Sequence, residues 1–129
     1  VLHCTHAVIG QMTELGWGRI ITVTSDSART GEARMAVYAA SKAAGASLMR
    51  SLSKELGRDG ITCNTLSLGT IVPAELAGTE RMLAHAKRYP LRRLGTYDNV
   101  ASAVAWLVSD DGGWTTGQTI PINGGYSTS

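Results

Sequence analysis

The sequence has 129 residues, of which 43% are hydrophobic and 17% are charged, and its formal net charge is +2. This is enough chain for one small globular domain, and the charge is too small and too scattered to predict nucleic-acid binding. No apolar run reaches the length of a membrane span, and Cys4 and Cys63 form neither a disulfide framework nor a zinc pattern, so we expect a cytoplasmic protein that binds neither membrane nor metal.

The first predicted elements are a helix and a strand. Apolar residues recur at helical intervals from Val1 to Leu15, with no capping residue before them. Because the sequence begins inside this pattern, and without Met, we expect it to be a segment of a longer chain. After Gly16, residues 19–24 are short, β-branched and apolar, which is typical of a buried parallel strand.

The rest of the chain alternates between helices and strands. Gly57 is the expected end of one long helix, Asp98 is the expected N-cap of another, and Pro121 favours a sheet edge for the last strand. This alternation indicates βαβ units and a parallel sheet, hence an α/β fold. We expect a loop over residues 25–34, helices over 36–56, 79–88 and 99–108, an irregular stretch over 69–78, and strands over 61–66 and 118–122.

Tyr38, Lys42 and Ser25 are the candidate catalytic residues. The i, i+4 spacing of Tyr38 and Lys42 places both side chains on one face of the long helix. A phenol is a poor proton donor or acceptor at neutral pH, and a neighbouring ammonium favours its ionised form. Ser25 follows an apolar strand, where sites form in open α/β sheets. For Ser25 a loop hydroxyl that bonds nearby backbone is the alternative, and Ser27 is interpreted in that way.

Four segments in order resemble the short-chain dehydrogenase/reductase family. They are residues 18–25 (GRIITVTS), 38–43 (YAASKA), 64–69 (NTLSLG) and 117–125 (GQTIPINGG). The resemblance covers nearly the whole chain and is closest to the 3-oxoacyl-(acyl-carrier-protein) reductase-like branch. It implies that residues 1–129 are the C-terminal catalytic half of a Rossmann-like doubly wound parallel sheet, with three strands and flanking helices.

The resemblance also implies a chemistry, namely hydride transfer between NAD or NADP and a small alcohol or carbonyl substrate. Tyr38 would be the general acid or base, Lys42 would favour ionised Tyr38 and bind the nicotinamide ribose, and Ser25 would hold the substrate carbonyl. Gly69, Thr70 and Ile71 would line the nicotinamide side, largely through backbone groups. The helices near residues 1–15 and 36–56 resemble a pair that forms homodimers or homotetramers, and the small side chains of residues 43–47 suit close packing.

Two positions depart from the family pattern. Leu68 stands in place of a proline, and Pro73 stands where many members have a threonine that contacts the nicotinamide, so we expect altered cofactor affinity. The family's glycine-rich phosphate turn does not occur in these residues. The nucleotide-binding half would therefore precede Val1, the 129-residue chain alone is expected to be inactive, and the NAD or NADP preference cannot be read from it.

Several alternatives stay open from the sequence. The chain could instead be a non-catalytic half-domain that acts as a dimerisation or interaction module. The basic residues of 87–93 are read as a solvated helix end in preference to a phosphate-binding patch. Met82, Leu83 and Tyr89 could form a lid or pack as an ordinary helix, and Glu32 and Arg34 could face a polar substrate or solvent.

Overall fold

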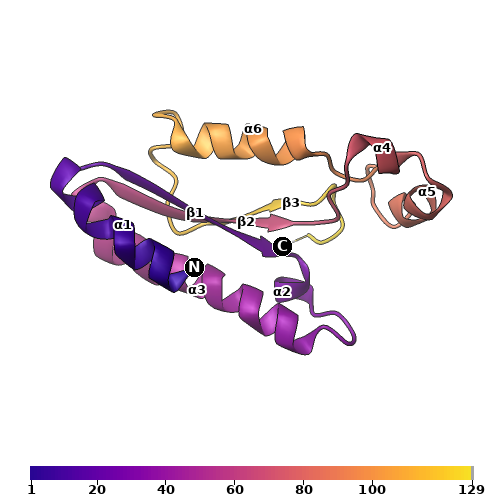
Figure 1. The fold of residues 1–129 in the computed structure, drawn as a ribbon, viewed down its shortest axis with the longest axis horizontal. Helices are drawn as coiled ribbons and strands as arrows, with labels where there is room; N and C mark the ends of the chain where they lie inside the picture. Colours follow the sequence, from indigo (N-terminus) through magenta and orange to yellow (C-terminus); the bar gives the residue numbers. More distant parts are fainter. Residues whose placement is uncertain (129) are drawn as a thin grey trace.

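The computed structural model describes residues 1–128 as a three-stranded parallel sheet with helices on both faces (Figure 1). This architecture confirms the predicted α/β class. In chain order the elements are α1 (Leu2–Leu15), β1 (Gly18–Ser25), α2 (Ser27–Thr30), α3 (Ala36–Leu56), a 3-10 turn (Gly57–Asp59), β2 (Ile61–Leu68), α4 (Ala74–Ala77), α5 (Glu80–Ala86), α6 (Tyr97–Val108) and β3 (Thr119–Ile122).

The strand order is β1-β2-β3, with β2 in the centre. β1 pairs with β2 along its whole length, from Gly18 opposite Ile61 to Ser25 opposite Leu68. The shorter β3 pairs only with the second half of β2 and ends with Ile122 opposite Leu68. Pro121 therefore lies on an edge strand of this sheet, as its missing N–H predicts.

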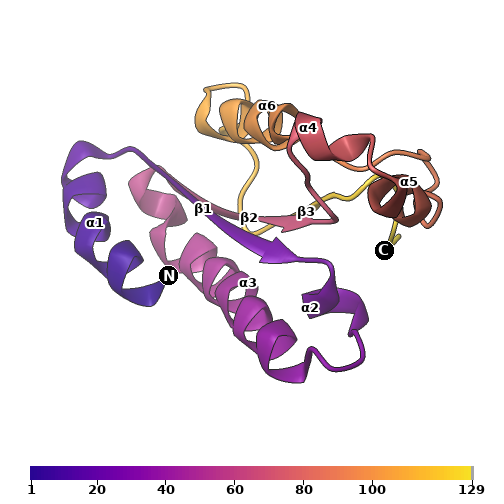
Figure 2. The same ribbon diagram turned by 45° about the vertical axis from the view of Figure 1, so that its right-hand side comes forward.

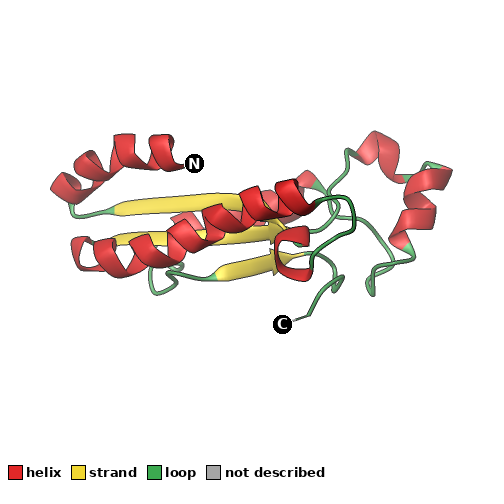
Figure 3. Cartoon of the chain, turned by 90° about the horizontal axis from the view of Figure 1, so that it is seen from below, coloured by secondary structure: helices red, strands yellow, loops and turns green. Residues whose placement is uncertain are grey.

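The helices form two layers around the sheet. Figure 1 shows α6 on one face and both α1 and α3 on the other, and in Figure 3 α3 crosses the sheet while α1 runs beside β1. The main core cluster lies between α3 and the central strand and consists of Met49, Ile61 and Cys63, which are essentially inaccessible to solvent. Burial raises the pKa of the Cys63 thiol to about 11, so this cysteine is a packing residue and not a nucleophile.

A second, smaller cluster lies beyond the carboxyl ends of the strands. There α4 and α5 extend away from the sheet (Figure 2), and Val72, Ala86, Tyr89 and Leu94 are buried together with partly buried Met82 against them. Met82 and Tyr89 therefore pack as in an ordinary helix, which is one of the two sequence interpretations, the other being a lid. The side chain of Leu83 is exposed.

Most helix and strand positions match the sequence predictions, but three local details were wrong. The predicted loop after β1 contains the short helix α2. Asp98 is not the N-cap of α6, because the helix starts at Tyr97 after Thr96, and the Asn99 side chain accepts the backbone N–H of Thr96 at 3.1 Å. The predicted irregular stretch over 69–78 contains the short helix α4, whereas α3 ends at Leu56 with Gly57 as its C-cap, as predicted.

The small side chains in the middle of α3 have a role within the chain itself. A Cβ added to Gly45 would lie 3.4 Å from Oγ1 of Thr22, a residue of β1, so the small residue allows the helix to approach the strand closely. Over the described residues, no helix is long and apolar enough to cross a membrane.

Candidate active site

The carboxyl edge of the sheet brings three chain segments together. Ser25, Leu68 and Ile122 are aligned across the three strands, and the segments that follow them remain tied by backbone hydrogen bonds. Asp26 N–H donates to the Leu68 carbonyl at 3.0 Å, and Gly69 N–H donates to the Ile122 carbonyl at 3.1 Å. Sites in parallel α/β sheets form at this edge, and the predicted Ser25 and Gly69 both lie there.

Ser25 is held by the residue that follows it by two positions. The hydroxyl of Ser27 donates to Ser25 Oγ at 2.9 Å, and the backbone N–H of Ser27 approaches the same oxygen at 3.3 Å. Ser27 is 5% exposed and lies in α2, so it is not the loop hydroxyl bonding nearby backbone that the sequence predicted. Its hydroxyl bonds a side chain of the candidate site, and the free hydrogen of Ser25 is left to donate elsewhere.

Tyr38 and Lys42 lie one turn apart on α3, as predicted. The Lys42 Nζ atom is 5.7 Å from the centroid of the Tyr38 ring and 3.5 Å from the carbonyl oxygen of Val23. The Lys42 carbonyl accepts the hydroxyl of Thr24 at 3.1 Å. These contacts fix the first half of α3 against the end of β1, with the Tyr38 side chain 42% exposed. Within residues 1–128, no hydrogen bond joins Ser25 to Tyr38 or Lys42.

The three predicted nicotinamide-side residues have different backbone environments. Gly69 N–H donates to the Ile122 carbonyl, and Thr70 N–H donates to the Tyr89 hydroxyl at 2.9 Å. The Thr70 carbonyl accepts Gly95 N–H at 3.0 Å. Across the described chain, the N–H of Ile71 has no such partner. Of the three positions, Ile71 is the one whose backbone donor is free for a ligand.

The Asp26 side chain joins several chain segments at this edge. Its carboxylate accepts the hydroxyl of Ser67 at 2.7 Å, the amide of Asn123 at 2.6 Å and the hydroxyl of Ser127 at 2.8 Å. The side chain is 2% exposed. Asp26 thus links the end of β1, β2 and the segment after β3 immediately beside Ser25. The sequence analysis missed this role because it placed Asp26 in a loop over residues 25–34.

A cavity of about 190 Å³ opens beside Ser25. Its walls include Ser27, Thr70, His85 and Arg88, so they come from α2, from the segment after β2, and from α5 and the residues just after it. Glu32 also lines this cavity, while Arg34 does not. A larger cavity of about 420 Å³ on the other side of Tyr89 contains Thr70 but none of Ser25, Tyr38 and Lys42, and it is therefore not the candidate active site.

Comparisons with known proteins agree with this geometry. The family described as enoyl-(acyl carrier protein) reductase matches residues 1–127. A 3-oxoacyl-(acyl-carrier-protein) reductase of Haemophilus influenzae is 36% identical over 127 residues, which are 97% of this chain and 52% of that protein. The chain belongs to the short-chain dehydrogenase/reductase family.

Solved structures of similar proteins have the same fold. A protein described as a dehalogenation enzyme superposes with a TM-score of 0.91 at 34% identity, over 98% of this chain and 54% of that one. A blue fluorescent protein from a metagenomic library, solved in complex with NADPH, superposes with a TM-score of 0.77 at 33% identity, over 85% of this chain and 45% of that one. The chain thus spans about half the length of the relatives that it matches.

Proposed function

We propose that the complete protein is an NAD(P)-dependent oxidoreductase that interconverts an alcohol and a ketone or aldehyde, and that residues 1–129 are the C-terminal catalytic half of its Rossmann domain. The observation that carries this proposal is the placement of Tyr38 and Lys42 on one face of α3, which Lys42 fixes against the end of the Ser25 strand. Family membership supports it, as does the half-length coverage of the relatives. The names of those relatives favour an enzyme over a non-catalytic interaction module.

Ser25 holds the substrate oxygen in this proposal. Because the Ser27 hydroxyl donates to Ser25 Oγ, the hydrogen of Ser25 can be donated to a carbonyl oxygen in the adjacent cavity. A hydroxyl that already accepts a hydrogen bond is also a more polarised donor. Ser27 therefore acts as a positioning residue for Ser25.

Tyr38 moves the proton. In ketone reduction its hydroxyl donates a proton to the developing alkoxide oxygen, and in alcohol oxidation it accepts that proton. Lys42, whose Nζ atom lies 5.7 Å from the centroid of the Tyr38 ring, is the cationic neighbour of this phenol in the proposal.

The residues present fit the nicotinamide end of NAD or NADP. The unpaired N–H of Ile71 and the ammonium of Lys42 are donors that would hold the carboxamide and the ribose. When bound, this cofactor supplies or accepts the hydride. Pro73, which precedes α4 with a φ of −59°, has no hydroxyl to add to these contacts, so the backbone carries them.

Tyr38→Phe in the complete protein tests the proposal. We expect kcat/KM for carbonyl reduction to fall by roughly 10²- to 10⁴-fold, the contribution typical of a positioned acid or base. Tyr97→Phe is the matched control, because Tyr97 is an exposed tyrosine at the start of α6. The rate of the nicotinamide absorbance change at 340 nm is measured for both variants. Thermal unfolding of each variant checks that neither substitution has destabilised the protein. A Tyr38→Phe enzyme with a rate near that of the wild type would remove Tyr38 from the mechanism.

A further inference from the structure

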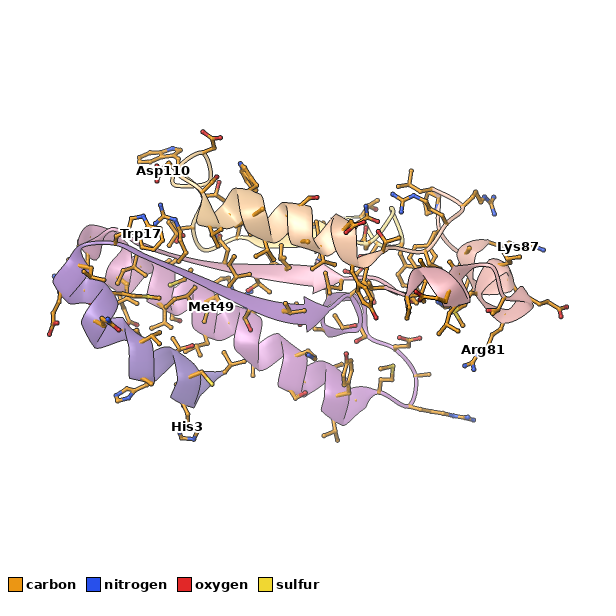
Figure 4. All side chains as sticks on the ribbon, turned by 45° about the horizontal axis from the view of Figure 1, so that its top comes forward. His3, Trp17, Met49, Arg81, Lys87 and Asp110 are labelled. Carbon is orange, nitrogen blue, oxygen red and sulfur yellow. The ribbon has the colours of Figure 1, made fainter. Side chains whose placement is uncertain are left out.

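Three basic side chains of α5 and the residues just after it lie at or beside the Ser25 cavity. Arg81, His85 and Arg88 occur at i, i+4 and i+7 along α5 and the residues just after it, a spacing that places them on one face. Figure 4 shows Arg81 and Lys87 on α5 and its C-terminal end, at the far end of the molecule from Trp17. Arg88 and His85 line the cavity that contains Ser25, and a neighbouring cavity of about 420 Å³ is lined by Arg81, His85 and Arg88. The two cavities share Thr70, His85 and Arg88, so they are neighbours at this end of the sheet.

These side chains are held in place by uncharged partners. Nη2 of Arg88 donates to the Tyr126 hydroxyl at 2.6 Å, and its guanidinium lies 5.2 Å from the centroid of the Tyr126 ring. A guanidinium has five N–H donors, so this one bond leaves the others available. Nε2 of His85 is 2.9 Å from Oγ1 of Thr70, which ties the middle of α5 to the segment that follows β2.

No carboxylate neutralises the two arginines. In the part of the chain that the structure describes, the only ion pair is Arg58–Asp59, at 3.9 Å. The cavity has two acidic residues, but the Asp26 carboxylate is bonded to Ser67, Asn123 and Ser127. Glu32 is exposed and makes no ion pair with Arg88. Neither carboxylate is paired with Arg81 or Arg88, so both guanidiniums keep N–H donors that can bind an anion.

The neighbouring basic residues differ from Arg88. Nη1 of Arg92 donates to the Lys87 carbonyl at 2.7 Å, and Nη1 of Arg93 donates to Oδ1 of Asn99 at 2.9 Å. These two arginines stabilise local backbone and a helix start, close to the solvated helix end that the sequence predicted. Arg88 is also exposed, and in addition it lines the cavity that contains Ser25.

We infer that the substrate carries an anionic group, a carboxylate or a phosphate, which Arg88 and Arg81 bind while the reacting carbonyl or alcohol lies at Ser25. This inference rests on the proposed function, because it assigns a substrate class to the same site. Arginine suits the task, since its planar fork can bind two oxygens of a carboxylate or phosphate at once. The anion can be part of the reacting molecule or part of a carrier to which that molecule is attached.

The decisive experiment measures anion binding without turnover. Succinate and inorganic phosphate are titrated into the complete protein by isothermal calorimetry, with Arg88→Met and Arg81→Met as variants that keep an apolar stem. We expect saturable binding to the wild type and a loss of about tenfold or more in affinity for Arg88→Met, the scale of a charge-assisted pair. Arg58→Met is the control, because the Arg58 side chain is 86% exposed and pairs only with Asp59, and it should bind as the wild type does.

Turnover then identifies where the anion resides. Acetoacetate, its neutral methyl ester and acetoacetyl-coenzyme A are compared as substrates. A preference for acetoacetate over the ester indicates a carboxylate on the reacting molecule, and a preference for the coenzyme A thioester alone indicates a carrier phosphate. For the preferred substrate, Arg88→Met should raise KM by about tenfold with kcat nearly unchanged, the pattern of lost uniform binding.

The outcomes separate the two proposals. No saturable binding of either anion, or an equal loss for the neutral ester and the anionic substrates in Arg88→Met, overturns the anion site while leaving the oxidoreductase intact. Anion binding that depends on Arg88, in a protein that transfers no hydride to any of the three carbonyl compounds, supports the anion site and counts against the proposed function.

Discussion

Asp26 shows how a single buried side chain can fix the geometry of the site. Three donors from different segments of the chain, Ser67, Asn123 and Ser127, converge on its carboxylate. Its own backbone N–H is paired with Leu68, and its neighbour in sequence is Ser25. A shift of this side chain would therefore move the candidate catalytic serine and loosen the segment after β3 together.

We expect Asp26→Asn to destabilise the protein. The new amide places two hydrogens where the carboxylate accepted bonds, so at least one buried donor loses its partner. Lost hydrogen bonds to a charged group cost about 1.5–3 kcal/mol each, and the free energy of unfolding should fall by roughly 2–4 kcal/mol. Urea unfolding of the complete protein measures this, with exposed Asp111→Asn as the control. A loss no larger than that of the control would mean that the network contributes little.

At the scale of residues, the sequence was informative where chemistry depends on spacing. Tyr38 and Lys42 could be placed on one helix face because the helical period alone determines that relation. The partners of Ser25 could not be found in this way, since the Ser27 hydroxyl could equally bond local backbone. The partners of Asp26 lie 41, 97 and 101 positions away in the sequence, and no local pattern encodes such contacts.

At the scale of elements, the hydrophobic pattern predicted the type and order of the helices and strands better than the residues at which they begin and end. The three strands and the long helices were found because their apolar residues have to meet a common core. The first and last residues of a helix depend on single side chains. When two candidate capping residues lie close together in the sequence, the pattern alone does not choose between them. Asp98 is a good cap by residue type, but the Asn99 side chain accepts the Thr96 N–H at 3.1 Å and so starts α6 earlier.

The faces of α1 and α3 are proposed as the contact between subunits. At the two ends of α1, Leu2 and Leu15 are 62% and 68% exposed, and Val37 on α3 is 86% exposed. Such apolar area on a helix pair is more typical of an interface than of free surface. We therefore propose that the complete protein forms a homodimer or homotetramer through these helices.

A charge on α1 tests this assembly. We expect Leu2→Lys combined with Leu15→Lys to lower the molar mass of the complete protein measured by size exclusion with light scattering, because a buried lysine without a partner opposes association. The control is Leu83→Lys, which puts the same charge on exposed α5. An unchanged mass in the double variant would place the subunit contact elsewhere.

At the scale of the whole molecule, the sheet has an unusual edge. Among the described residues β1 pairs with a strand on one side only, which is β2. The short, β-branched and apolar sequence of β1 is typical instead of a strand with neighbours on both sides. Val23 in its second half is 45% exposed. In the proposed complete Rossmann domain another strand would cover this edge, and the fold of half the domain would then depend on the other half.

The isolated 129-residue chain is accordingly expected to self-associate. An apolar edge strand offers unpaired N–H and C=O groups to a second copy, which favours aggregation or strand exchange. Val23→Lys should slow this association, measured by light scattering over time, because a charged side chain at an edge opposes strand addition. Leu83→Lys serves as the control for the added charge, since Leu83 is an exposed residue of α5. A chain that stays monomeric and resists proteolysis without any substitution would show that β1 is stable as an edge, and the half-domain would then be an independent folding unit.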